Sequence, residues 1–366
     1  MMVSAKRSER SGCDMGLDDR KKQVLQAIVD DYVSTYEPVG SKALIERHNF
    51  TVSSATLRNE MAELEKLGLI EKPHTSAGRI PSDKGYREYV DSLMHPDILS
   101  QEEQDEISAR ITDSVHEVTD LLHNATNALS EKTGFVSLAM SPRLHGSFLT
   151  QLKMLMIEPG KALVVVVLSA GVVKDKVVRI PNFLTNEQIM QISNAVEKNL
   201  YGKPLDEITL ITLASSVKES EIPEALMNQV IYEAYVAIKQ ADKLDVYLEG
   251  EHRMLSLPDF SELGRARDLL GTLSHDGMVA GYVNEIERDS MNTIGSDDSY
   301  MIRIGQEISL EGLEDCSFIT TTYNIGDTLS GNIGVIGPKR MDYSKVISQV
   351  NFVRKKLNDE IKRLSE

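Results

Sequence analysis

The amino-acid sequence predicts an α+β protein, and three observations lead to this class. Helical hydrophobic spacing dominates residues 17–94, runs of β-branched residues follow from about Phe135, and strand patterns return after Met301. Between the two groups of strands, helical patterns extend from Asn186 to about Ser290. This order favours one antiparallel sheet domain with an insertion of roughly 110 residues over a wound parallel sheet.

The segment 17–95 is predicted to form three helices and then a two-stranded loop. Asp18 is a suitable N-cap for the first helix, Ser41 for a short second helix, and Ser53 for a third helix that Gly68 ends. Short strands at 69–72 and 79–81 flank the loop, and a further helix begins at Ser82. A short helix, a tight turn, a capped helix and a hairpin follow one another in this way in a winged helix-turn-helix.

The third helix separates an apolar face from a hydrogen-bonding one. At about 100° per residue, Leu57, Met61 and Leu64 share one face, and polar or small residues occupy the other. A recognition helix reads base edges with its N-terminal residues, where Arg suits guanine and Asn suits adenine. The candidate DNA-binding residues of this helix are Ser53, Ser54, Ala55, Thr56, Arg58, Asn59 and Lys66. Any amphipathic surface helix divides in the same manner, so the order of the elements carries the interpretation.

The loop after the third helix is the candidate wing. Its residues with DNA-binding potential are His74, Thr75, Ser76 and Arg79. A wing tip of this composition can lie along phosphates or enter the minor groove. An ordinary surface turn would contain the same turn-forming residues.

The remainder of the chain predicts long helices and hairpins. Apolar residues at helical spacing from Ile107 to Leu129 predict one continuous amphipathic helix. Strands at 152–158, 162–169 and 172–180 form an antiparallel meander, and strands at 301–308, 317–325 and 331–337 precede a final amphipathic helix.

Charge is distributed unevenly along the chain. The formal net charge is −16, but residues 1–94 contain 14 Lys and Arg against 15 Asp and Glu. A nearly neutral segment can present a basic face if its acids point elsewhere, so composition neither favours nor excludes DNA binding.

Neither a membrane span, a secretory signal, a metal-ligand spacing nor a catalytic motif is found in the sequence. The glycines of GNIGVIG do not match a phosphate loop and are attributed to a hairpin and a strand. Two cysteines fit a reducing cytosol. We therefore expect a cytoplasmic protein that is not an enzyme and needs no cofactor.

Residues 38–94 closely resemble the heat-inducible transcription repressor family HrcA. The stretches that carry the resemblance are VSSATLRNEMAELE and KPHTSAGRIP, and DVYLEGEHRMLSLPDF and the region around GNIGVIG are similar in layout. The resemblance implies a winged-helix domain at 17–95, a GAF-like domain at 96–190 and 291–366, and an inserted dimerisation domain at 191–290. Residues 1–16 precede the family pattern and are expected to be a basic, disordered tail.

The resemblance also implies a function. Members of the family repress chaperone operons as homodimers on inverted-repeat operator DNA, and they depend on the chaperonin GroEL, which heat shock diverts. The candidate residues named above would form the recognition face and the wing. The alternative is a ligand-responsive regulator whose GAF-like domain senses a small molecule; strands that are almost continuously Val and Leu favour a packed core instead.

Overall fold

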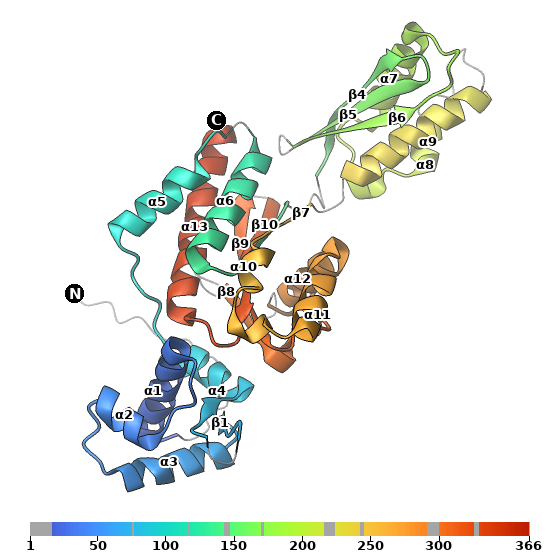
Figure 1. The fold of residues 1–366 in the computed structure, drawn as a ribbon. Coiled ribbons are helices and arrows are strands. Elements are labelled where there is room, and N and C mark those ends of the chain that lie inside the picture. The colour runs from blue at the N-terminus through green and yellow to red at the C-terminus, as the bar shows by residue number, and fades with distance from the viewer. Residues whose placement is uncertain are drawn as a thin grey trace.

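The structure is a computed structural model, and it describes residues 17–74, 77–115, 117–142, 147–169, 172–215, 224–241, 245–290, 300–325 and 329–365. The predicted N-terminal tail, Thr75 and Ser76 lie outside these residues. Helices and strands occur in separate groups along the described chain, which confirms the α+β class (Figure 1). None of the described helices has the length and apolar character needed to cross a membrane.

The N-terminal unit, residues 17–94, contains helices whose buried apolar side chains belong to a cluster shared with the rest of the chain, followed by a two-stranded antiparallel ribbon (Figure 1). Its elements are α1 (Asp19–Thr35), α2 (Ser41–Arg47), α3 (Ser54–Lys66), β1 (Ile70–Glu71), β2 (Ile80–Pro81), α4 (Asp83–Glu88) and the π-helical turn η1 (Tyr89–Leu93). Gly85 lets α4 approach the ribbon, because a Cβ at this position would lie 1.9 Å from the carbonyl oxygen of Leu69. The predicted order of elements is therefore confirmed for this segment.

The sheet unit, residues 95–142 and 245–365, is built on a five-stranded antiparallel sheet of order β7-β3-β10-β9-β8. Its strands are β3 (Val136–Met140), β7 (Val246–Glu249), β8 (Tyr300–Ile304), β9 (Cys316–Ile325) and β10 (Leu329–Pro338). Its helices are α5 (Gln101–Ile111), α6 (Val118–Thr133), α10 (Glu251–Met254), η3 (Pro258–Phe260), α11 (Leu263–Leu273), α12 (Asp276–Ser290), η4 (Gly305–Glu307) and α13 (Tyr343–Ser365).

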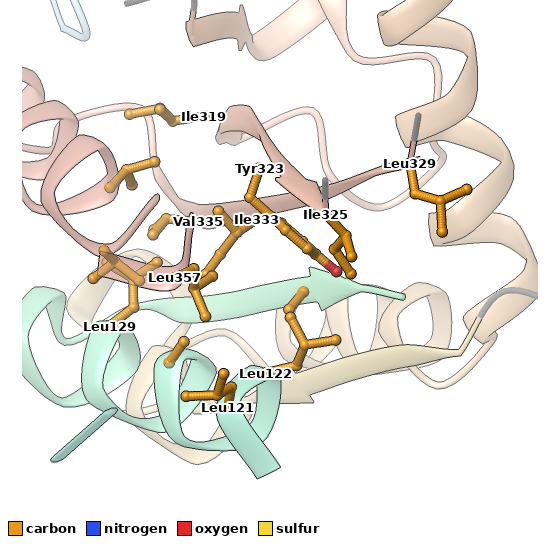
Figure 2. Packing of buried hydrophobic residues seen from close by; sticks show 14 of the residues in the cluster. Leu121, Leu122, Leu129, Ile319, Tyr323, Ile325, Leu329, Ile333, Val335 and Leu357 are labelled. Atoms are coloured by element: carbon orange, nitrogen blue, oxygen red, sulfur yellow. The ribbon is translucent and has the colours of Figure 1, made fainter. Parts of the chain in front are cut away.

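Both faces of the five-stranded sheet are covered. Side chains of α6 and α13 pack on one face against Ile319, Tyr323 and Ile333 (Figure 2). On the other face, residues of α10, α11 and α12 pack against Val136 and Phe318. The glycines of GNIGVIG lie in β10, as predicted, and Gly331 gives the Tyr323 ring room to reach the carbonyl oxygen of Met140.

The long helix predicted from Ile107 to Leu129 is wrong as one continuous element. The chain turns between α5 and α6, where Ser114 adopts a φ of 52°. The Asn124 side chain holds the turn by donating to the carbonyl oxygens of Ile111 and Asp113 over 3.2 and 2.7 Å. The apolar stripe is real, but folding it into a hairpin lets both halves pack on α13.

The inserted unit, residues 147–241, forms a second sheet (Figure 1). Its elements are β4 (Leu149–Glu158), β5 (Lys161–Leu168), β6 (Val173–Arg179), α7 (Asn186–Leu200), η2 (Leu205–Glu207), α8 (Leu210–Ser215) and α9 (Glu224–Ala241). The predicted meander is confirmed, but its assignment to the sheet of the C-terminal strands is wrong. The strands between 149 and 179, which were expected in the first part of that domain, thus belong to the insertion. Conversely, β7, α11 and α12 were expected in the insertion but pack with the five-stranded sheet. The three strands bury one face against helices of their own, so they need no other sheet.

Candidate nucleic-acid interface

Helix α3 is fixed in the N-terminal unit by its apolar face and by its cap. Leu57, Met61 and Leu64 are buried. Ser53 is the N-cap, and its hydroxyl accepts the Thr56 N–H over 3.2 Å, as predicted. At the other end the helix stops at Lys66, and Gly68 takes a φ of 74° that favours glycine.

The opposite face of α3 is open to solvent. Ala55, Arg58, Asn59 and Lys66 are exposed. Among the residues that the structure describes, neither Arg58 nor Lys66 has an ion-pair partner. The guanidinium of Arg58 and the amide of Asn59, one residue apart, can therefore offer hydrogen bonds to a molecule lying along the helix.

The acids of the same helix are paired elsewhere. Glu60 lies 3.6 Å from Arg20 and 3.5 Å from Lys21, both on α1, and Lys21 also lies 2.9 Å from Glu63. Glu65 lies 2.7 Å from Arg79. Hydrogen bonds to Asp18 and Glu63 raise the pKa of Lys21, which keeps this ammonium group charged. The pairing turns the negative charges of α3 toward its own unit and leaves a basic outer face.

The hydroxyl groups near the start of α3 bond within the protein. Ser54 Oγ lies 3.0 Å from Ser41 Oγ, and Ser53 Oγ lies 3.0 Å from Thr56 Oγ1. Ser41 was predicted to cap α2, but Gly40 is the N-cap and Ser41 is the first helical residue, because its hydroxyl bonds to Ser54 instead. This contact joins the N-termini of α2 and α3, so Ser54 and Thr56 are only half-exposed.

A buried carboxylate holds the turn that precedes α3. Asp31 of α1 is 5% exposed, and its carboxylate lies 2.9 Å from His48 Nε2 and 3.3 Å from Arg47 Nη1. Its neighbour Asp30 accepts the Tyr89 hydroxyl over 3.1 Å, and burial raises the pKa of Asp30. The end of α2 is thus tied to α1, which fixes the angle at which α3 leaves the turn.

The structure describes two of the candidate wing residues, of which His74 is exposed and Arg79 is engaged. His74 is exposed at the loop. Arg79 donates from Nε and Nη2 to Glu65 over 3.1 and 2.7 Å, and its backbone pairs with Val39. The Arg79 side chain is only 14% exposed, so it braces the ribbon against α3.

Two exposed lysines outside the predicted set lie near this face. Lys42 is the second residue of α2, next to the Ser41–Ser54 contact, and Lys72 follows β1. Neither lysine is among the residues that the sequence predicts to bind DNA. The signal for Lys42 is its position in the first turn of the helix before α3, where a side chain is near the start of a recognition helix.

No group of His, Cys, Asp and Glu suited to a metal ion occurs among the described residues. The exposed side chains of this face offer positive charge and hydrogen-bond donors, which suits the phosphates and bases of a nucleic acid; they are Arg58, Asn59, Lys66, Lys42 and Lys72.

Comparison with known proteins identifies the family. Residues 119–347 match the family model described as HrcA protein C terminal domain. A heat-inducible transcription repressor HrcA of Ruminiclostridium cellulolyticum is 39% identical over 96% of this chain and 99% of its own, and one of Acetivibrio thermocellus is 38% identical over 96% and 98%. A crystal structure of a hypothetical protein superposes with a TM-score of 0.60 at 22% identity, covering 95% of this chain and 99% of that one. The chain belongs to the family of heat-inducible transcription repressors HrcA.

Proposed function

We propose that this repressor binds inverted-repeat operator DNA of chaperone operons through a winged helix-turn-helix formed by α1, α2, α3, β1 and β2. The observation that carries the proposal is the outer face of α3, where Arg58, Asn59 and Lys66 are exposed while the acids of the helix are paired. Arg58 and Asn59 would read base edges in the major groove. Ser53, Ala55 and Lys66, with Lys42 on α2, would contact or approach the phosphates.

The loop 72–79 would serve as the wing. His74 and Lys72 are exposed there and would reach the backbone beside the recognition helix, as would Thr75 and Ser76. Arg79 would support the wing through Glu65 more than touch DNA. Ser54 and Thr56 would fix the start of α3 while leaving their remaining hydrogen-bonding capacity to a phosphate.

The inserted unit would form the dimer. The open face of its sheet carries an apolar patch next to Lys153 and Asp175: Leu155 of β4, Leu163 of β5 and Val177 of β6 are direct cross-strand neighbours, and Leu155 and Val177 are 51% and 55% exposed. Ile157 and Val173 extend this face. An apolar patch of this kind is typical of an interaction site, and a second copy related by two-fold symmetry would cover it with an identical patch. Two recognition helices related by the same axis suit an inverted repeat.

Dependence on the chaperonin is proposed as the heat-sensing step. The apolar face of the inserted unit and the long separation of the strands that form the main sheet support it, because both prolong exposure of apolar surface during folding. Free chaperonin would then set how much active repressor is present in the cell.

Fluorescence anisotropy tests the DNA-binding proposal. Labelled duplexes carrying the inverted repeat of a chaperone promoter are titrated with the protein, with a scrambled duplex of equal length and composition as control. We expect binding to the inverted repeat to be tighter by about a thousandfold or more at physiological salt. Equal affinity for both duplexes would refute operator recognition.

A further inference from the structure

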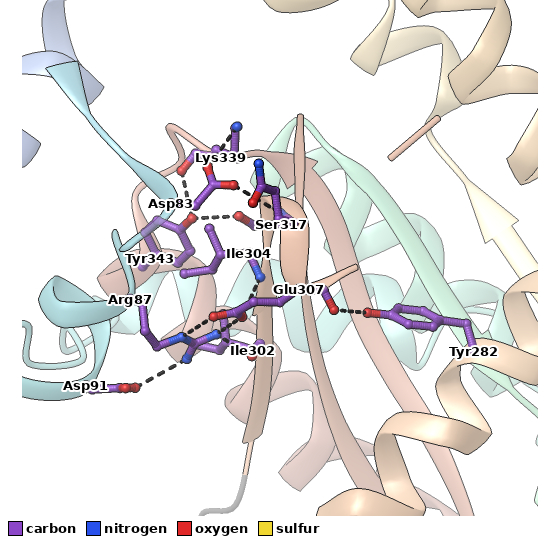
Figure 3. Close-up of polar contacts among 11 residues, drawn as sticks. Asp83, Arg87, Asp91, Tyr282, Ile302, Ile304, Glu307, Ser317, Lys339 and Tyr343 are labelled. Atoms are coloured by element: carbon purple, nitrogen blue, oxygen red, sulfur yellow. Dashed lines mark hydrogen bonds and ion pairs between the residues drawn. The ribbon is translucent and has the colours of Figure 1, made fainter. Parts of the chain in front are cut away.

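Polar contacts join the N-terminal unit to the sheet unit at three places, and those of Arg87 and Asp83 appear in Figure 3. Beside them, the Tyr86 ring lies 5.9 Å from the Tyr343 ring, and both belong to one hydrophobic cluster. In the first, Arg87 of α4 donates from Nε to Glu307 over 2.9 Å, and its Nη2 bonds the second oxygen of the same carboxylate. The same Nη2 donates to the carbonyl oxygen of Ile302 in β8 over 2.8 Å. Glu307 is itself held by the N–H of Ile304 at 2.9 Å. A two-pronged Arg–carboxylate pair with a third bond to the backbone defines an orientation as well as a distance.

The second contact is made by Asp83, one turn earlier on α4. Its Oδ1 lies 2.8 Å from Lys339 Nζ, and its Oδ2 accepts the N–H of Gln306 over 3.0 Å. Gly305 makes room for this carboxylate, because a Cβ at Gly305 would lie 2.0 Å from Asp83 Oδ2. Burial alone would lower the pKa of Lys339, but its bond to Asp83 outweighs this and raises the pKa, so Lys339 stays charged.

The third contact reaches the end of α1. The guanidinium carbon of Arg340 lies 3.4 Å from the centre of the Tyr36 ring, and Arg340 Nε donates to Asp259 over 2.6 Å. Arg340 is only 7% exposed, and Tyr36 is the left-handed C-cap of α1. A desolvated cation stacked on a ring is worth more than an exposed one. The sheet unit therefore contacts the N-terminal unit at both α4 and α1.

Charged groups dominate this junction beyond the three contacts. A cavity of about 220 Å³ lies between the units and is lined by Asp83, Tyr86, Lys339 and Arg340, among others. The Tyr86 hydroxyl is buried beside it and has no hydrogen-bond partner in the described residues. The cavity and the unpaired hydroxyl leave the packing around the Tyr86–Tyr343 contact incomplete, so the ion pairs contribute to the geometry of the junction.

We propose that Asp83, Arg87, Glu307, Lys339 and Arg340 form a latch that holds α3 at one fixed orientation to the sheet unit, and so presents the two recognition helices of a dimer at one half-site spacing. The proposal rests on the proposed function. If the dimer forms through the inserted unit, the two α3 helices are related by the same two-fold axis only when the sheet unit holds each N-terminal unit in one orientation. The covalent connection at 95–99 alone would allow many orientations, and the latch selects one.

The residues of the latch are positioning residues, since none of them lies on the outer face of α3. Their loss should leave the affinity for a single half-site unchanged. It should weaken binding to a correctly spaced inverted repeat, because a freely oriented second recognition helix has a lower effective concentration at its half-site.

The test measures affinity against half-site spacing. An inverted repeat selected by the protein from a random duplex pool is resynthesised with its spacer lengthened in single base-pair steps, and a single half-site serves as reference. The wild-type protein should lose about tenfold or more in affinity when half a helical turn, about five base pairs, is added. In Arg87→Ala and in Glu307→Ala, the same added spacer should reduce the affinity by less than about threefold, and the affinity for a single half-site should be unchanged. The double variant should behave like either single variant. Arg110→Ala is the matched control, because it breaks an ion pair with Glu131 that lies within the sheet unit, and it should keep the wild-type dependence on spacing.

A sharp profile in the latch variants would overturn the proposal, as would equal losses on the half-site and the repeat. An electron-spin distance measurement between labels at Gln26→Cys in α1 and Leu263→Cys in α11, in a Cys13→Ser background diluted with unlabelled protein, needs no DNA. We expect one narrow distance in the wild-type background and a broad distribution with Arg87→Ala. A narrow distance distribution in both the wild-type background and Arg87→Ala would refute the latch even if the protein binds no inverted repeat. A broader distribution in Arg87→Ala would support the latch independently of the DNA-binding proposal.

Discussion

At the residue scale, ion pairing decides what the N-terminal unit shows to solvent. Its charges nearly cancel in number, yet Glu60, Glu63 and Glu65 are all paired with cations of α1 or the ribbon. Arg58 and Lys66 are left without ion-pair partners among the described residues, so the unpaired charges on the outer face of α3 are positive although the chain as a whole is strongly acidic.

Replacing Arg58 with Ala should weaken specific operator binding by about 1–3 kcal/mol and relax base preference at one position of each half-site. Lys66→Ala, two turns further along α3, should weaken binding to all sequences alike and reduce the salt dependence by about one phosphate contact. Anisotropy titrations on operator and scrambled DNA at several salt concentrations separate the two effects. If Arg58→Ala lowered both affinities equally, Arg58 would be a backbone contact.

Lys21 offers a test of the ion-pairing argument itself. Lys21→Ala and Lys22→Ala remove the same charge from adjacent residues of α1, but only Lys21 pairs with Glu60 and Glu63. We expect Lys21→Ala to reduce DNA affinity by roughly twofold more than Lys22→Ala at low salt, and the difference to vanish at high salt, where exposed charges are screened. Equal losses at low salt would mean that the acids of α3 do not affect the bound DNA.

At the element scale, most helix caps and stops could be predicted from local signals, with Ser41 as an exception, whereas features set by distant residues could not. The caps Asp18 and Ser53 and the stop at Gly68 follow from neighbours a few residues away, so the bounds of α1 and α3 could be predicted. The break between α5 and α6 depends on the Asn124 side chain and on packing against α13, which hydrophobic spacing does not encode. The sheet to which β4, β5 and β6 belong depends on which helices cover them, and this is decided by residues distant in the sequence.

The candidate site shows the same division. The spacing of apolar residues placed Ala55, Arg58, Asn59 and Lys66 on the exposed face of α3. The engagement of Arg79 by Glu65 could not be predicted, because it requires the ribbon to fold back on α3. Periodicity assigns a face to a residue, but it does not give that residue's partner.

The open face of the inserted sheet predicts a change in oligomeric state. Leu155→Glu places a charge within the apolar patch formed with Leu163 and Val177, and should shift the protein from dimer to monomer at micromolar concentration, since an unpaired buried charge is costly at an interface. Leu263→Glu in α11, where the side chain is 85% exposed, is the matched control and should leave the dimer intact. Sedimentation equilibrium gives the masses. A Leu155→Glu variant that remains fully dimeric would place the interface elsewhere.

At the scale of the whole molecule, the main sheet is assembled from distant parts of the chain. β3 pairs with β10 in the register Asn332↔Met140, and the Tyr323 hydroxyl bonds the carbonyl oxygen of Met140 over 2.8 Å. The complete inserted unit lies between these partners in sequence. Contacts at such separation are slow to form, so the strands of both sheets are exposed for longer during folding.

Refolding should therefore depend on a chaperonin. After thermal or denaturant unfolding, we expect the protein to recover little operator binding alone and most of it with chaperonin and ATP, because the apolar strands β5 and β10 would otherwise pair between molecules. Operator binding is measured after refolding at several temperatures, and light scattering measures aggregation in parallel. Full recovery without chaperonin would contradict the heat-sensing proposal and would favour regulation by a small molecule.

Hydroxyl-radical footprinting on a chaperone promoter tests most directly whether this chain is a repressor that reads an inverted repeat as a dimer. Two protected regions related by two-fold symmetry should appear on the wild-type footprint, centred one helical turn of about 10 base pairs apart or a multiple of it. Arg58→Ala should remove both at once, since each copy contributes the same helix. A single asymmetric protected region, or symmetric protection that survives the loss of Arg58 unchanged, would contradict recognition by a pair of α3 helices.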